Sequence, residues 1–260
     1  MAWDPAQYQR YGDERSRPFG DLLARVGAEA PRRVVDLGCG PGNLPAQLAR
    51  RWPEAEVVGL DSSEPMLERA RSLTGARLRF ELGDIADWDP ADLRPDVIVA
   101  NASLQWVPGH LALVASWARA LPPDGWLALQ VPANFGAPSH ALMRATAELP
   151  HWRPALGGVL RHADAVHELA DYDEVLADAG CAVDAWDTTY LHVLTGDDPV
   201  LEWVRGTGLR PALDALGGPG SPDAQRFEQE YAERLRTAYP STAHGTPFPF
   251  ARRFAVAHRA

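Results

Sequence analysis

A glycine-rich loop that directly follows a short apolar stretch constrains the fold more than any other feature of the sequence. Residues 34–43 read Val-Val-Asp-Leu-Gly-Cys-Gly-Pro-Gly-Asn, and apolar residues then recur at helical spacing at Leu44, Leu48 and Trp52. Glycine lets such a loop turn sharply and approach a ligand closely. The free N–H groups at the start of the following helix attract an anionic group. The pattern therefore predicts a strand, a nucleotide-type binding loop and a helix.

The acid inside this motif favours one ligand over another. A dinucleotide would place a pyrophosphate over the loop, and Asp36 would be a poor neighbour for two phosphates. S-adenosylmethionine (SAM) has no phosphate and carries a cationic head that a carboxylate can bind directly or through water. Backbone N–H groups of the loop are then expected to bind the carboxylate of SAM. The expected cofactor contacts of the motif are Asp36, Gly38, Cys39, Gly40 and Gly42.

A second acid follows the loop at the sequence separation that is typical of a ribose-binding carboxylate. Residues 56–61 are predicted to form a strand that ends in Asp61, about 20 residues beyond the loop. From that position a carboxylate accepts hydrogen bonds from both ribose hydroxyls. The next helix begins near Ser62, and Met66 on its inner side is a candidate to pack on the adenine ring.

Two further strand ends complete the expected cofactor site. The strand at 78–82 leads into Asp84, which can accept from the adenine amino group, and Ile85, which can pack on the ring. Residues 96–101 are predicted to form a strand whose middle, Val97 to Ala100, is continuously apolar, as in a central parallel strand. Their exit lies at the carboxyl edge, where open α/β sheets bind ligands. The expected cofactor contacts there are Asn101, Ala102 and Ser103.

Composition excludes several classes of function. The chain of 260 residues contains no lysine, so Schiff-base chemistry, pyridoxal phosphate enzymes and Walker-type loops are excluded. A net charge of −10 argues against nucleic acid as a partner. We expect no membrane association, because no apolar stretch has the length of a membrane span and no signal peptide is evident. Two distant cysteines favour the cytoplasm, and the expected state is a monomer or weak homodimer.

The rest of the chain is expected to complete a single domain. Residues 1–30 are predicted to form an N-terminal lid or helix, with a helix beginning at Ser16 and with Tyr11 near the cofactor. The predicted SAM-binding core spans 31–132, a helical cap 133–163 and 200–245, and the final strands 182–194 and 252–259. The histidines of the irregular segment are expected at the surface, and no metal site is predicted.

Together these motifs resemble the class I SAM-dependent methyltransferases. Segments outside the cofactor motifs, such as Trp186-x-Thr188-Thr189-Tyr190 and 207–211, narrow the resemblance to the enzymes that methylate trans-aconitate. The resemblance implies a Rossmann-like α/β fold, with a seven-stranded, mostly parallel sheet, helices on both faces and a helical cap. It also implies transfer of a methyl group to a carboxylate of a small anionic acid. That reaction needs no metal and no general base, because a carboxylate is ionised at pH 7.

The acceptor site is the least constrained part of the prediction. A multiply charged anion needs local cations, and arginine pairs with carboxylates through two parallel bonds. The candidate positioning residues are Arg15, Arg17, Gln105, Trp106, Tyr190, His192, Arg210 and Arg252. Three alternatives stay open: a methyltransferase for another small molecule, a SAM-binding protein without catalysis, and an NAD-dependent oxidoreductase.

Overall fold

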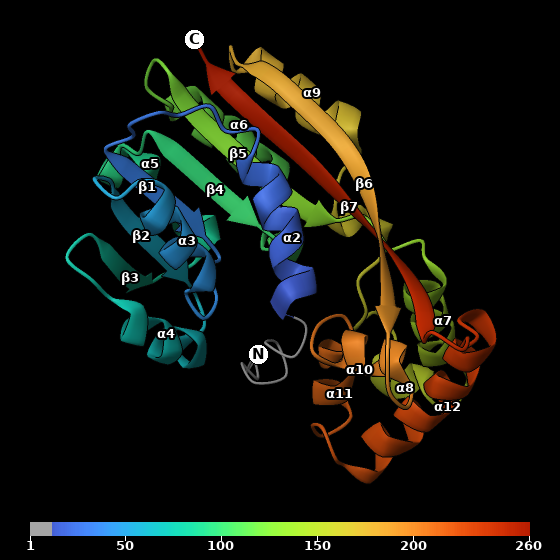
Figure 1. Cartoon of the computed structure of the whole chain (residues 1–260). Helices are drawn as coiled ribbons and strands as arrows, with labels where there is room; N and C mark the ends of the chain where they lie inside the picture. Colours follow the sequence, from blue (N-terminus) through green and yellow to red (C-terminus); the bar gives the residue numbers. More distant parts are fainter. Residues whose placement is uncertain (1–11) are drawn as a thin grey trace.

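A seven-stranded mixed sheet organises the molecule. The computed structural model describes residues 12–260, and its strands follow the order β3-β2-β1-β4-β5-β7-β6 (Figure 1). Strands β1 to β5 run parallel to one another, whereas β7 is antiparallel to both β5 and β6, which confirms the predicted sheet. The strands are β1 (Arg33–Leu37), β2 (Glu56–Asp61), β3 (Leu78–Leu82), β4 (Val97–Asn101), β5 (Gly125–Pro132), β6 (Ala182–Leu194) and β7 (Thr246–Arg259).

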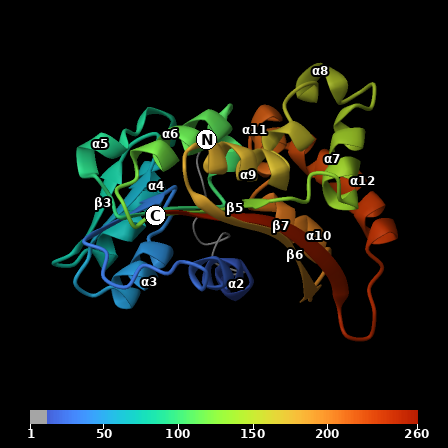
Figure 2. The ribbon, with the colours of Figure 1, turned by 90° about the horizontal axis from the view of Figure 1, so that it is seen from above.

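Helices cover both faces of the sheet (Figure 2). Alternate residues of one strand point to opposite faces, and here both faces are apolar. Val34 of β1 packs in the layer of α2 (Gly12–Leu23) and α3 (Asn43–Arg51), and Val35 packs in the layer of α6 (His110–Ala120) and α9 (Leu169–Asp178). This burial on both sides explains why β1 and β4 read as continuous apolar runs. The shorter helices along this part of the chain are α4 (Glu64–Ala70), α5 (Pro90–Leu93) and the 3₁₀ turns η1 (Arg71–Leu73), η2 (Ile85–Asp87), η3 (Leu104–Trp106) and η4 (Ala163–Ala165).

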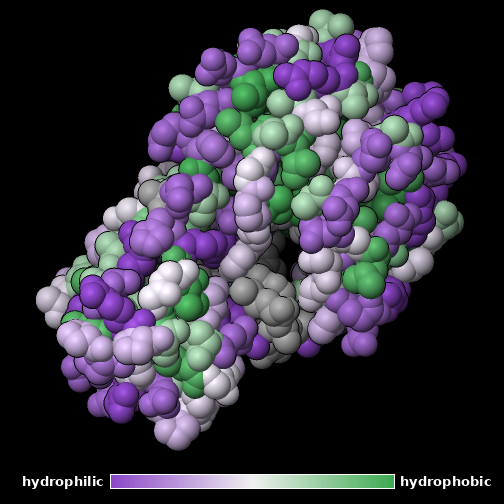
Figure 3. Space-filling view, turned by 180° about the vertical axis from the view of Figure 1, so that it is seen from behind, coloured by the Kyte–Doolittle hydropathy of each residue, from purple (hydrophilic) through white to green (hydrophobic). Residues whose placement is uncertain are grey.

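The long strands β6 and β7 continue past the sheet and carry a helical cap (Figure 1). The cap has its own apolar core, in which Trp203 and Phe248 join Trp152, Phe227 and Tyr231. A space-filling view from behind shows a hollow between this cap and the lobe formed by the sheet (Figure 3). The cap helices are α7 (Pro138–Ala147), α8 (Arg153–Leu156), α10 (Pro199–Arg205), α11 (Arg210–Ala215) and α12 (Pro222–Ala238).

Two elements begin earlier than the sequence predicts. Helix α2 begins at Gly12 rather than at Ser16, with Pro18 inside it. Burial of Phe19 and Leu22 against the sheet compensates for the hydrogen bond that a proline removes. Strand β7 begins at Thr246 rather than at residue 252, because proline is tolerated at ladder positions whose N–H faces away from the neighbouring strand.

No helix within residues 12–260 is long and apolar enough to cross a membrane.

Candidate functional site

The three glycines of the loop after β1 have different structural roles. At Gly38, φ is +81° and an added Cβ would lie 2.3 Å from the Cβ of Ser103. At Gly42, φ is +86° and an added Cβ would lie 2.9 Å from the Cβ of Ala70. These two glycines therefore allow close packing within the protein. Gly40 also has a positive φ, of +56°, but a Cβ added there would have no atom of the described residues within 4 Å. Its open face is the part of the loop that a ligand can approach.

The loop is held to the end of β2 by its own N–H groups. Gly38 and Cys39 donate to the carbonyl oxygen of Leu60 at 2.8 and 2.9 Å. Gly40 donates to Asp61 Oδ2 at 2.8 Å, and the other oxygen of Asp61 accepts from Ser63 N at 2.8 Å. The expectation that these loop N–H groups are available to bind the carboxylate of a ligand is therefore wrong. Asp61 positions the loop and keeps lone pairs that can accept from a ligand.

A cavity opens beside this loop and is lined by acids and apolar side chains. Asp84 caps η2 by accepting from Ala86 N at 2.9 Å, and Ser103 Oγ donates to Leu37 O at 2.7 Å. The cofactor cavity is lined by Gly38, Gly40, Asp61, Ser62, Ser63, Met66, Asp84, Ile85, Ala102, Ser103, Trp106 and Val107. Most of the predicted cofactor contacts are thus brought together by four strand ends.

This lining fits the chemical groups of SAM. A carboxylate at the end of β2 suits ribose hydroxyls, and Met66 and Ile85 offer an apolar surface to a ring. The hydroxyl of Ser63 is buried and has no hydrogen-bond partner within residues 12–260, so it can serve a ligand. No group of three or more histidine, cysteine, aspartate or glutamate side chains among the described residues could hold a metal ion.

Four of the predicted cofactor contacts that the structure describes lie outside this lining. Gly42 packs as described above, and the Cys39 side chain packs against Leu67, Ala70 and Phe80. Asn101 lines a neighbouring cavity instead.

Asp36 is the fourth of these residues and lies under the loop. Its side chain is buried, and neither carboxylate oxygen has a hydrogen-bond partner among the described residues. Burial, together with the charge of Asp61, raises the pKa of Asp36 to about 8. This carboxyl is therefore largely protonated at neutral pH unless a cation comes near it.

A second cavity adjoins the first and carries the opposite charge. The two share Ala102 and Trp106, and the second has a volume of about 80 Å³ against about 330 Å³ for the first. Its lining contains no aspartate or glutamate among the described residues. The acceptor cavity is lined by Asn101, Ala102, Gln105, Trp106, Pro132, Asn134, Phe135, His140, Arg161, Trp203, Thr207, Gly208, Phe250 and Arg252.

Two predicted positioning residues present polar groups in the acceptor cavity. Arg252 of β7 is buried, donates from Nη1 to Gln130 Oε1 at 3.0 Å and lies 4.8 Å from the centre of the Phe250 ring. Gln105 donates to Ala102 O at 2.6 Å, and its Oε1 is buried with no partner within residues 12–260. The cavity can therefore bind both a carboxylate and a hydrogen-bond donor.

Arg161 lines the same cavity but is not among the positioning residues that the sequence predicts. It follows the short helix α8, in an irregular stretch without periodicity. No local signal distinguishes it, because arginine fills every basic position of this lysine-free chain. Its guanidinium lies over the Trp106 ring at 3.3 Å and donates to Gln105 O at 3.1 Å. Burial lowers the pKa of Arg161 to about 10.

Other predicted acceptor residues take part in packing and ion pairs elsewhere. Tyr190 donates to Asp21 at 2.6 Å with Arg17 over its ring at 5.2 Å, and His192 stacks on Trp203. Arg210 pairs with Asp214 in its own helix at 3.0 Å. None of these four predicted residues belongs to the described lining of either cavity. Tyr11 lies outside the described residues, and the Arg15 side chain lies outside the side chains that the structure describes.

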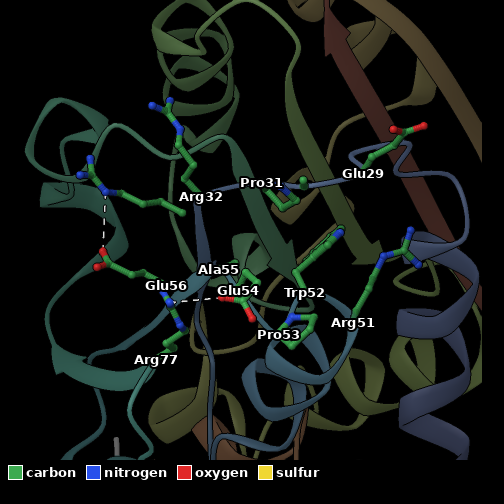
Figure 4. Close-up of a pocket in the computed structure, with 12 residues that line it drawn as sticks. Glu29, Pro31, Arg32, Arg51, Trp52, Pro53, Glu54, Ala55, Glu56 and Arg77 are labelled. Carbon is green, nitrogen blue, oxygen red and sulfur yellow. Dashed lines mark hydrogen bonds and ion pairs between the residues drawn. The ribbon is translucent and has the colours of Figure 1, made fainter.

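A further hollow lies at the opposite end of the strands (Figure 4). It is lined by residues 29–33, 51–56 and 77. Its charges pair with one another, as in Arg33–Glu56 at 3.7 Å and Arg77–Glu54 at 3.3 Å. The carboxyl edge, with its unpaired polar groups, is therefore the candidate site.

Known proteins resemble this chain over almost its full length. Residues 8–185 match the family described as a methyltransferase domain. A protein of Streptomyces avermitilis named trans-aconitate 2-methyltransferase is 53% identical, over 99% of this chain and 97% of its own. A protein of the same name from Streptomyces coelicolor is 55% identical, over 99% of this chain and 86% of its own.

The fold also recurs among solved structures. The YcgJ protein of Bacillus subtilis has a TM-score of 0.59 and 16% identity, and the match covers 94% of this chain and 98% of that one. Fold, cavity and sequence identity agree. The chain therefore belongs to the methyltransferase family, among relatives that carry the name trans-aconitate 2-methyltransferase.

Proposed function

We propose that the protein transfers the methyl group of SAM to a carboxylate of trans-aconitate or a closely related small polycarboxylic acid. The products are a monomethyl ester and S-adenosylhomocysteine. One observation carries the proposal: a cavity with two arginines and no acid among its described lining adjoins the acid-lined cofactor cavity, in a chain of net charge −10. The names of the relatives support the same acceptor.

The residues around the acceptor need to hold it in position, and they do not need to transfer a proton. Bound SAM supplies an electrophilic methyl group, and a carboxylate is already ionised at pH 7. Burial, and then the charges of Arg161 and Arg144, lower the pKa of His140 to about 4. This histidine is neutral at pH 7 and a weak base, in keeping with a reaction that abstracts no proton.

Alignment and desolvation are then the main contributions of the protein. Arg252 binds one carboxylate through its guanidinium, and Trp106 forms the wall common to both cavities. The aromatic rings of Phe135, Trp203 and Phe250 exclude water around the acceptor. Holding the reacting atoms close together in a dry site supplies most of the acceleration in such a reaction.

The test is a methyl-transfer assay with radiolabelled SAM against a panel of di- and tricarboxylic acids, with product masses measured. We expect label in a product heavier than trans-aconitate by one methylene. Transfer to an unrelated acceptor, with none to any polycarboxylate, would replace the proposed substrate class. SAM binding without transfer to any acceptor would indicate a binding protein.

A further inference from the structure

Arg161 is a partly buried cation without a carboxylate partner among the described residues. Arg253 is the informative comparison, because its side chain is only 10% exposed and it pairs with Glu168 at 2.8 Å and Asp187 at 3.0 Å. Burial opposes the charge of Arg253, but the bonds to these two acids raise its pKa. Arg161 has no such acids among the residues that the structure describes, and burial lowers its pKa. A guanidinium that has lost part of its hydration is stabilised when an anion binds it, so Arg161 is a candidate to bind an anionic ligand.

The surroundings of Arg161 fix its orientation and leave its hydrogen-bond donors available. The guanidinium lies on Trp106, with the Phe135 ring centre at 5.7 Å. Its described hydrogen bond is a single one, from Nη1 to Gln105 O. Stacking on an aromatic ring engages the face of a guanidinium, and its N–H groups lie along its edge. Arg161 is therefore oriented to bind a planar carboxylate through two parallel bonds.

The other described groups that line the cavity around Arg161 add no negative charge. His140 is neutral, as argued above, and Arg144 donates from Nη2 to Phe135 O while its Nη1 is buried without a partner among the described residues. Arg161 follows α8, whereas Arg252 belongs to β7. Two cations on different elements can each bind a separate carboxylate of one small molecule.

We propose that Arg161 binds the carboxylate that a tricarboxylic acceptor has in addition to those of a dicarboxylic acid, and that it thereby sets the preference for the former. The inference rests on the proposed function and deepens it. Arg252 binds one spectator carboxylate, Arg161 binds the other, and the third is left to react. Arg161 is thus a specificity-determining residue, and it transfers no proton.

The experiment compares trans-aconitate with itaconate, which has one carboxylate fewer, in the wild type and in Arg161→Gln. For each acid, kcat and KM are measured. If turnover of itaconate is too slow, its constant for inhibition of trans-aconitate methylation replaces its KM. We expect Arg161→Gln to raise the KM for trans-aconitate at least 30-fold and the constant for itaconate less than threefold. The preference for the tricarboxylic acid then collapses. Arg161→Lys keeps the positive charge but loses the planar guanidinium that makes two parallel bonds. This variant should recover part of the preference for the tricarboxylic acid.

Two controls separate binding from folding. Arg153→Gln removes an exposed arginine of the same cap segment, which pairs with Glu148, and should leave both constants unchanged. Thermal unfolding and SAM affinity of Arg161→Gln should match those of the wild type. Equal losses for both acids, or wild-type constants in Arg161→Gln, would overturn the inference.

Failure of the proposed function gives a different result. A wild-type protein that methylates no polycarboxylate would exclude the function. Calorimetric titration of trans-aconitate into protein saturated with S-adenosylhomocysteine would still decide the role of Arg161. Equal affinities in the wild type and Arg161→Gln would contradict it.

Discussion

The cofactor cavity and the acceptor cavity share a wall but differ in charge and in how the chain builds them. The first draws its lining from residues 38–107, at the ends of consecutive parallel strands, and contains Asp61 and Asp84. The second draws on residues 101–252 and contains Arg161 and Arg252 without an acid among its described lining. A cation-binding half and an anion-binding half therefore meet at Trp106. This difference in charge supports our proposal that the cationic methyl donor binds on one side and the anionic acceptor on the other.

The largest expected effect tests whether the cofactor half depends on close packing. Gly38→Ala combines a positive φ with a Cβ 2.3 Å from that of Ser103. We expect destabilisation by about 2–5 kcal/mol, the sum of backbone strain and overpacking. The measurement is urea unfolding without ligand. Gly40→Ala is the matched control, because its Cβ meets no described atom, and it should lose SAM affinity with a smaller loss of stability. Equal stability of Gly38→Ala and the wild type would contradict the packing role.

Asp61→Ala tests the acidic character of the cofactor half. It removes a carboxylate that binds Gly40 N and Ser63 N and that can accept from a ligand. We expect SAM binding to weaken by about 1.5–3 kcal/mol, the range for hydrogen bonds to a charged group. Calorimetry measures the affinity, and Asp61→Asn should lose less because one oxygen remains. Unchanged affinity in a folded Asp61→Ala protein would remove this residue from the site.

Arg252→Gln tests the anionic specificity of the other half. Loss of a charged partner should raise the acceptor KM by about tenfold to 30-fold, equivalent to about 1.5–2 kcal/mol, and lower kcat through misalignment. SAM affinity, measured by calorimetry, should not change. Arg210→Gln, whose arginine pairs with Asp214, should alter KM less than about twofold. Similar losses in both variants would contradict the assignment of the acceptor cavity.

The last prediction concerns the pH dependence that arises from the buried acid beneath the loop. The pKa of Asp36 is about 8 in the fold, whereas an unfolded aspartate has a pKa near 4. Between these values the folded protein holds a proton that the unfolded chain releases. Stability without ligand should therefore fall as pH rises from about 4 to about 8, and Asp36 contributes to this slope. Urea unfolding at several pH values measures the slope. Asp36→Asn should lack this contribution, and an identical slope in both proteins would contradict the pKa.

The same comparison explains how far the sequence could predict the structure. Asp61, Asp84 and Ser103 are predictable because each lies at or just after the end of a strand, and parallel strands bring their carboxyl ends to one edge. Arg161 was missed because tertiary packing on Trp106, rather than a local pattern, places it in the site. Arg210 was wrongly grouped with the cavity because its segment belongs to the cap while its side chain pairs with Asp214.

The long hairpin of β6 and β7 has a consequence for evolution. It anchors one end in the sheet and the other in the cap, whose apolar core is distinct from the two cores beside the sheet. Substitutions inside the cap can therefore accumulate, and reshape which acid is accepted, without disturbing the loop after β1. Proteins with such a hairpin can therefore change their acceptor during evolution while they keep the same methyl donor.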